Sequence, residues 1–176
     1  MPAPSKSAST ECAFVLGDDG LAKWSDTHAD AWIGLLETHK RLTRALDADL
    51  EAEHGLTISA LEALGRLAAA PGRSLGLSAL ASECGLSLSR ISRIMDSLQA
   101  RGLVERRTVA DDARAVEGHL TDAGLKLVRC AQKAHFESVQ QVFFQKLSDE
   151  EIATLASVFS RFAPRAAEAC SSIEQP

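Results

Sequence analysis

Serine and arginine side chains recur on one predicted helix near the middle of the chain. Ser87, Ser89, Arg90, Ser92 and Arg93 occupy the face of this helix that lies opposite its apolar residues. Short hydroxyl side chains let a helix sit deep in a DNA groove, and an arginine can donate hydrogen bonds to a guanine edge or to a phosphate. This combination predicts a helix that reads double-stranded DNA. The alternative is an ordinary solvated helix face.

The residues around this face follow a helix-turn-helix pattern. Ser78 is placed to cap a short helix over residues 79–84, and Gly85 supplies the left-handed backbone that a tight turn needs. Ser87 is expected to cap the second helix, which ends near Arg101. A short helix, a tight turn and a second helix with a polar face are the parts of a helix-turn-helix.

A predicted hairpin follows the second helix. Two short strands are expected over residues 104–108 and 114–120, joined by a turn over residues 109–112. An arginine-bearing hairpin beside a reading helix forms a wing, whose tip can lay arginine along a minor groove. The alternative is a surface hairpin with ion pairs of little energetic worth. The further residues predicted to contact DNA are Ser78, Arg106, Arg107, Asp112 and Arg114.

The charge of the chain is unevenly distributed. The 176 residues have a net charge of −5, but residues 66–114 hold eight arginines and five acidic residues, which makes this segment net positive. A local positive patch attracts phosphates, and the acidic remainder limits non-specific binding. We recognise no phosphate loop, metal triad or Ser/His/Asp arrangement, so we expect no enzyme and no cofactor or metal. Without a long apolar run or a signal peptide, we expect a cytoplasmic protein that does not contact the membrane.

Long amphipathic helices flank the helix-turn-helix. We expect them over about residues 24–54, 57–70, 121–147 and 148–170. The first helix and the last two are long, and each has an apolar stripe along one face. A winged module alone is too small to bury these stripes. They therefore predict a homodimer, in which two recognition helices lie about one DNA turn apart, ~34 Å.

These patterns together predict a mainly α fold with a small β-hairpin wing, in which long N- and C-terminal helices form the dimer. Residues 1–20 are expected to form a flexible tail. Residues 21–55 and 121–172 are expected to form the helical dimerisation region, and residues 56–120 the winged helix-turn-helix lobe.

Two motifs resemble the MarR family of transcriptional regulators. They are the run from Gly85 to Arg107, and Asp112-Ala113-Arg114 followed by Leu120-Thr121-Asp122-Ala123-Gly124. The resemblance covers about residues 24–170 and implies a winged-helix core, a dimer built from the first and last two helices, and palindromic operators. It places the Ser/Arg helix in the major groove and Arg114 in the minor groove. Ala113 and Leu88 depart from the polar or basic residues that are common at these positions.

The resemblance also implies a ligand. Regulators of this type respond to small, often phenolic or anionic, molecules between the dimer helices and the DNA-binding lobe. The candidate pocket residues are Trp24, His28, Trp32 and His39 on the first helix and Glu62 on the second. The alternative is that the two tryptophans are anchors in the dimer core. In a urate-responsive branch, Trp24, Glu62 and Arg106 would fill three positions imperfectly, but Ile94 stands where a second arginine is expected.

Three other functions stay open at this point. One is a sequence-indifferent architectural DNA-binding protein, and another is an interaction protein that has lost DNA binding. The third is a redox-sensing regulator that uses a cysteine. The four cysteines are far apart and form no Cys-x-x-Cys pair, which favours free thiols. They are Cys12, Cys84, Cys130 and Cys170.

Overall fold

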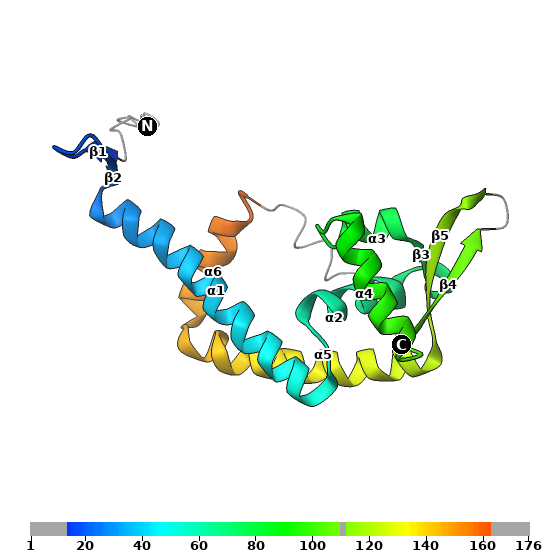
Figure 1. Ribbon diagram of the computed structural model, residues 1–176. Coiled ribbons are helices and arrows are strands. Elements are labelled where there is room, and N and C mark those ends of the chain that lie inside the picture. The colour runs from blue at the N-terminus through cyan, green and yellow to red at the C-terminus, as the bar shows by residue number, and fades with distance from the viewer. Residues whose placement is uncertain (1–13, 110–111, 163–176) are drawn as a thin grey trace, which may run out of the picture. The chain divides into compact units, whose positions relative to one another are not determined.

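The computed structural model describes residues 14–109 and 112–162, apart from the side chains of residues 109–115. The chain divides after Leu42 into two compact units. The protein is mainly helical, with two small antiparallel sheets (Figure 1). The described elements are β1 (Phe14–Leu16), β2 (Ala22–Trp24), α1 (Asp26–His54), α2 (Ile58–Ala69), η1 (Pro71–Arg73), β3 (Ser74–Gly76), α3 (Leu77–Glu83), α4 (Leu88–Ala100), β4 (Val104–Val109), β5 (Asp112–Leu120), α5 (Asp122–Val142), η2 (Phe144–Lys146) and α6 (Asp149–Phe159).

A β-hairpin precedes α1 in the first unit. β1 and β2 pair antiparallel with Phe14 opposite Trp24, and the chain reverses at the glycine-flanked turn over residues 17–20. The tail prediction is therefore wrong for residues 14–20, and Trp24 lies in a strand instead of opening the first helix. Strands of three residues are too short to show an alternating pattern. Residues 1–13 lie outside the described part of the chain.

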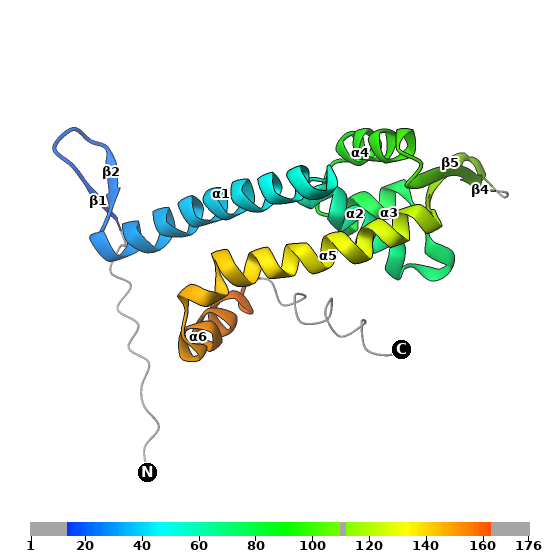
Figure 2. The ribbon, with the colours of Figure 1, turned by 90° about the horizontal axis from the view of Figure 1, so that it is seen from below.

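The second unit encloses its core between helices and a three-stranded sheet. The strand order is β3-β5-β4, and both pairings are antiparallel. Helix α2 lies between α4 and α5 (Figure 2). Leu64, Leu80, Ile91, Met95 and Leu120 are fully buried in this core. The predicted fold class, mainly α with a β-hairpin wing, is confirmed.

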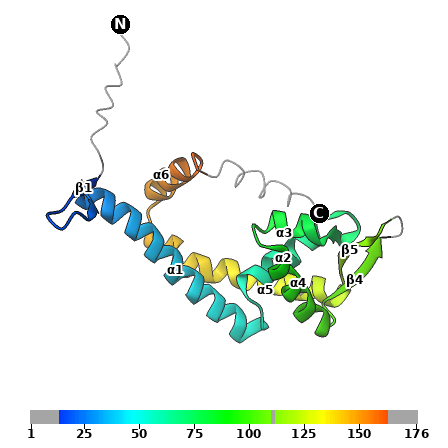
Figure 3. The same cartoon turned by 45° about the horizontal axis from the view of Figure 1, so that its top comes forward.

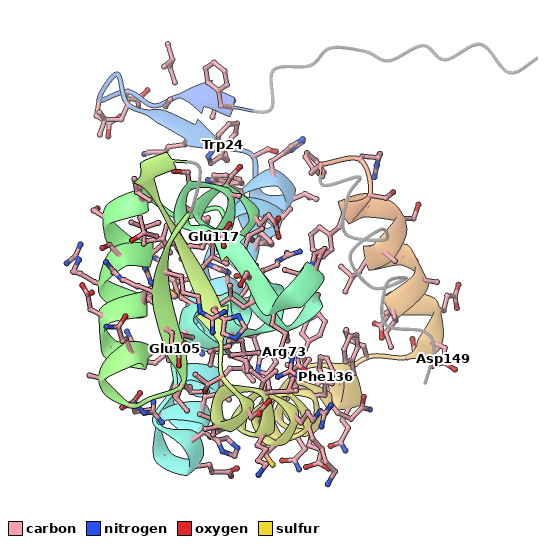
Figure 4. All side chains as sticks on the ribbon, turned by 90° about the vertical axis from the view of Figure 1, so that its right-hand side faces the viewer. Trp24, Arg73, Glu105, Glu117, Phe136 and Asp149 are labelled. Atoms are coloured by element: carbon pink, nitrogen blue, oxygen red, sulfur yellow. The ribbon has the colours of Figure 1, made fainter. Side chains whose placement is uncertain are left out.

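Strand β3 is an element that the sequence analysis missed. Ser74 pairs with His119 across the sheet, and Ser74 Oγ and His119 Nδ1 share a hydrogen bond of 3.0 Å. Next to it, Arg73 Nη1 lies 2.7 Å from Asp122 Oδ1, at the start of α5 (Figure 4). This bond from Arg73 holds the pKa of Asp122 below its usual value. Strand β3 thus joins the sheet to the beginning of α5.

Helix caps explain where most helices begin. Thr57, Ser87, Thr121 and Ser148 each accept a hydrogen bond from the backbone amide three residues later, as the sequence predicted. The capping box at Ser148 is complete. Ser78 does not cap α3, because α3 begins one residue before it and has no side-chain cap. A residue already inside the first turn cannot act as the N-cap.

The helix expected over residues 121–147 ends earlier than predicted. Helix α5 stops at Val142, and Phe143 leaves the helical conformation with φ −125° and ψ −66°. Its ring packs edge-on against Phe144, with ring centroids 5.2 Å apart, and η2 follows. The last helix, α6, ends at Phe159 and residues 160–162 form a turn, so the predicted helix is wrong for these residues. Its predicted end near residue 170 lies outside the described residues.

Candidate nucleic-acid interface

Helix α4 has one face in the core and one face open to solvent. Ile91 and Met95 are fully buried and anchor the helix on the sheet and on α3. Gly85 adopts φ +62°, the left-handed conformation that the turn between α3 and α4 requires. The helix therefore presents a fixed set of polar residues. Ser87, Ser89, Arg90 and Arg93 are exposed, and Ser92 is half-buried.

The two arginines of this face have weak internal partners. Arg90 Nη2 donates to Ser59 Oγ of α2 at 3.2 Å, and Arg93 Nε donates to the carbonyl of Ser89 at 3.4 Å. Ser87 Oγ accepts from the backbone amide of Arg90 and so fixes the first turn of the helix. Hydrogen bonds of this length cost little to exchange. Both guanidinium groups can therefore turn toward a base edge or a phosphate.

A groove runs along α4 on the side of α1 and α2. It has a volume of about 490 Å³ and is lined at one side by Gly55 and Thr57. Three arginines, Arg90, Arg93 and Arg101, line the groove together. With Glu51 as the acidic residue among the lining side chains, the groove has a net positive charge, which suits a phosphate backbone. Neither Ser59 nor the side chain of Arg101 was predicted from the sequence, because their hydrogen-bond partners are distant in sequence.

Arg106, a predicted DNA contact, is bonded to helix α4 in the structure. Its Nη2 atom lies 2.8 Å from Asp96 Oδ1 and donates to the carbonyl of Ser92 at 2.8 Å and to its hydroxyl at 3.0 Å. Its backbone amide also donates to Gln99 Oε1 at 3.2 Å. All of these partners belong to α4. Arg106 therefore ties β4 to α4, beside which the hairpin lies (Figure 3).

Because Arg106 joins β4 to α4, we expect its replacement to reduce the stability of the fold rather than to remove a contact with DNA. Arg106→Ala should lower the free energy of unfolding by about 1–2 kcal/mol, because it removes charge-assisted hydrogen bonds from a half-buried site. Asp96→Ala should cost less, since Asp96 is exposed and the bonds from Arg106 to Ser92 remain. Urea denaturation of both single variants and the double variant would measure this. Unchanged stability with weakened DNA binding would instead make Arg106 a DNA contact.

The remaining wing residues are described only in part. Arg107 Nη2 pairs with Glu105 Oε2 at 2.9 Å, and both side chains are exposed. In the sheet, Arg107 lies opposite Glu117, which Figure 4 shows on β5. The side chains of Asp112 and Arg114 lie outside the described ones, so their predicted contacts stay predictions. The backbone of the wing extends further than predicted, because its strands end at Val109 and begin again at Asp112.

The candidate ligand residues are divided between the two units. Trp24 lies in β2 with its ring edge-on to Phe14, at 6.2 Å between centroids. His28 Nδ1 shares a hydrogen bond of 2.7 Å with Ser25 Oγ, and Trp32 and His39 lie on exposed turns of α1. Glu62 belongs to the second unit, where it pairs with Arg66 at 3.5 Å. A pocket built from these residues therefore stays a prediction.

Two of the four cysteines lie in the described residues. Cys84 is buried at the end of α3, and Cys130 is exposed on α5. Burial, together with the nearby carboxylate of Glu62, raises the pKa of Cys84 to about 11. The thiolate is the reactive form of cysteine, so Cys84 is a poor redox sensor. Cys12 and Cys170 lie outside the described residues.

Alkylation in the native state should distinguish these thiols. With a pKa near 11, only about one Cys84 in a thousand is a thiolate at pH 8, and burial hinders the reagent further. Cys84 should therefore react with iodoacetamide at least about tenfold more slowly than the exposed Cys130. Peptide mass spectrometry of timed samples, with a urea-unfolded control in which the difference disappears, would measure this. Equal native rates would contradict the assignment.

The fold and the arginine-bearing face of α4 define a winged helix-turn-helix protein. The sequence profile of the MarR family matches residues 54–115. The structure is similar to AbsC, a MarR family transcriptional regulator from Streptomyces coelicolor, with 30% sequence identity and a TM-score of 0.73, over 83% of this chain and 99% of AbsC. At this identity and coverage, the chain belongs to the MarR family of transcriptional regulators, which are not enzymes.

Two further solved structures agree with this assignment. A second MarR family regulator from S. coelicolor, solved in complex with DNA, is 26% identical with a TM-score of 0.73, over 81% of this chain and 89% of its own. Wild-type MarR from E. coli in its apo form is 21% identical with a TM-score of 0.62, over 73% of this chain and 93% of its own, and supports the fold alone. No curated protein sequence matches the chain. Among the described helices, none is both long and apolar enough to span a membrane.

Proposed function

We propose that the protein is a cytoplasmic, dimeric repressor that binds a palindromic operator and is released by a small phenolic or anionic ligand. The observation that carries this proposal is the exposed Ser/Arg face of α4, whose opposite face is locked in the core. The buried face fixes the orientation of α4, so its exposed side chains can be held against the base edges in a DNA groove. The S. coelicolor relative that was solved with DNA supports the same use of the fold.

Exposed apolar residues support the dimer. Between residues 14 and 42 no described residue is buried, although α1 has four apolar residues within little more than one helical turn, Trp32, Ile33, Leu35 and Leu36. A helix half in which no residue is buried by the described part of the chain gains stability when a second copy covers it. We therefore propose that residues 21–55 and 121–172 form the dimerisation region and residues 56–120 the DNA-binding lobe.

The helical region of the second unit also exposes aromatic rings. Phe136 on α5 is 64% exposed, and Figure 4 shows its position. Phe144 and Phe159 are also exposed. These residues lie in α5, η2 and α6, which the resemblance assigns to the dimer. Burial of aromatic rings contributes strongly to interface energetics, so their exposure in one chain favours a two-fold partner.

Selection of binding sites from random DNA at fixed salt tests the proposal. We expect a two-fold symmetric motif, whose half-sites are one helical turn apart, and a complex of two chains per duplex. A steep salt dependence without any preferred motif would make the protein an architectural DNA binder instead. A metabolite screen for release of the selected operator would then identify the ligand class.

A further inference from the structure

One side chain connects the end of α1 to the end of α4. Arg101 follows the last residue of α4, and its guanidinium turns back toward the α1–α2 connection. Arg101 Nη2 donates to the carbonyl of His54 at 2.8 Å, and Arg101 Nη1 donates to the carbonyl of Gly55. These two carbonyls are at the C-terminal end of α1. The forked guanidinium thus binds two adjacent carbonyl groups of another helix.

The C-terminal end of α1 offers favourable hydrogen-bond acceptors to the guanidinium of Arg101. Its last carbonyls have no partner within the helix, and they carry the negative end of the helix dipole. Gly55 adopts φ +62°, a left-handed conformation that favours glycine, and a Cβ there would make an ordinary contact of 3.5 Å with the guanidinium nitrogens of Arg101. Glycine therefore ends the helix because of its backbone conformation, and the guanidinium of Arg101 lies directly against it. A cation at this position stabilises the helix end.

Helix α4 is held firmly on its other sides. The bonds from Arg106 to Ser92 and Asp96 tie it to β4. On β5, a Cβ at Gly118 would lie 2.5 Å from the Cε of Met95, so the side chain of Met95 packs directly on the backbone of the sheet. Helix α4 is therefore joined to the wing and the sheet by both polar and apolar contacts. Helix α4 also packs on α3 and bonds to α2 through Arg90 and Ser59, and the bonds from Arg101 join its end to the end of α1, a helix of 29 residues.

We propose that Arg101 is a positioning residue that transmits the direction of α1 to the recognition helix α4. In a dimer built through α1, this contact sets the separation of the two recognition helices. The inference rests on the proposed dimeric function. It assigns to Arg101 a role distinct from phosphate binding, although Arg101 lines the same groove as Arg90 and Arg93.

Two variants separate positioning from phosphate binding. Arg101→Lys keeps the positive charge but cannot fork across two carbonyls, whereas Arg101→Gln loses the charge. Affinity is measured by fluorescence anisotropy on the selected operator and on operators whose half-site spacing is longer or shorter by one base pair. Arg129→Gln, which removes an exposed charge on α5, is the matched control. Circular dichroism checks that every variant folds.

Both Arg101 variants should lose discrimination between spacings by about fivefold or more, while Arg129→Gln keeps it. The dependence of affinity on salt should stay that of the wild type, because no phosphate contact is lost. A uniform loss on every spacing, with a shallower salt dependence in Arg101→Gln only, would overturn the proposal in favour of a phosphate contact. Unchanged discrimination in both variants would also overturn it. If Arg101→Gln does not fold, Arg101→Lys decides alone.

Failure of the proposed function has a different signature in the same experiment. If the wild-type protein itself selected no symmetric operator and preferred no spacing, the proposal that a dimer binds a palindromic operator would be wrong. That outcome does not depend on the Arg101 variants. If the wild-type protein prefers one spacing and the Arg101 variants prefer it equally, the dimer stands and only the role of Arg101 is lost.

Discussion

Gly124→Ala is expected to lower the free energy of unfolding by about 3 kcal/mol. Gly124 is buried in the first turn of α5, and a Cβ there would overlap the carbonyl oxygen of Leu103 and approach Leu120 Cδ1 to 2.6 Å. That carbonyl already accepts hydrogen bonds from the backbone amide and the hydroxyl of Thr121. Overpacking against backbone usually costs about 1–3 kcal/mol, and here it also disturbs the cap of α5.

Urea denaturation followed by circular dichroism would measure this loss. Gly76→Ala is the matched control, because Gly76 has φ −59° and no atom within 4 Å of its would-be Cβ. The control should change stability by less than about 1 kcal/mol. If Gly124→Ala were as stable as the control, α5 would not approach the α4–β4 connection as closely as the structure shows.

This contact gives a physical reason for one of the motifs in the sequence. In the segment from Leu120 to Gly124, Leu120 fills the core, Thr121 caps α5, and Gly124 allows the helix to start against the backbone of Leu103. The cap could be predicted from sequence, because a threonine before a helix acts on amides only three residues away. The need for glycine could not, because Leu103 comes from the preceding connection and its position depends on the fold.

The same distinction explains which parts of the fold were predicted. The amphipathic helices and the turn glycine Gly85 have local signals, and the structure confirms them. Strand β3 has only three residues and pairs with β5 some 45 positions later, so its residues show no period of their own. The N-terminal hairpin was missed for the same reason. Its two strands have three residues each, and the segment up to residue 20 was predicted as a flexible tail.

For the candidate site, the sequence predicted which residues are of a type that can contact DNA. It did not predict which hydrogen-bond partners these residues have within the protein. Arg90, Arg93 and Arg106 all qualify as DNA contacts by type. The structure separates them, because Arg106 has three acceptor atoms on α4 while Arg90 and Arg93 have one weak internal bond each. Arg101 was noted only as the end of a helix, since its acceptors lie 46 and 47 positions earlier in the chain. An arginine can therefore either bind DNA or stabilise the fold, and the hydrogen-bond acceptors around it in the structure distinguish the two roles.

Arg90→Ala is expected to show the largest loss of operator affinity. Arg90 is exposed on the first turn of α4, and its bond to Ser59 Oγ at 3.2 Å is weak enough to exchange for a base. A forked contact to one guanine contributes about 1–3 kcal/mol, so two subunits on one operator should lose about 2–6 kcal/mol together. Fluorescence anisotropy at fixed salt, on the selected operator and on a random duplex, would measure both affinities.

Two controls show what kind of contact is lost. Arg129→Ala removes an equal charge from α5 and should leave both affinities nearly unchanged, because exposed charges far from the duplex are screened. Ser59→Ala keeps the charge of Arg90 and removes only its internal partner, so its effect on the operator should be much smaller than that of Arg90→Ala. An equal loss on operator and random DNA would make Arg90 a phosphate contact. No loss on either would mean that the exposed face of α4 does not meet DNA, and the argument from that face to a sequence-specific regulator would fail.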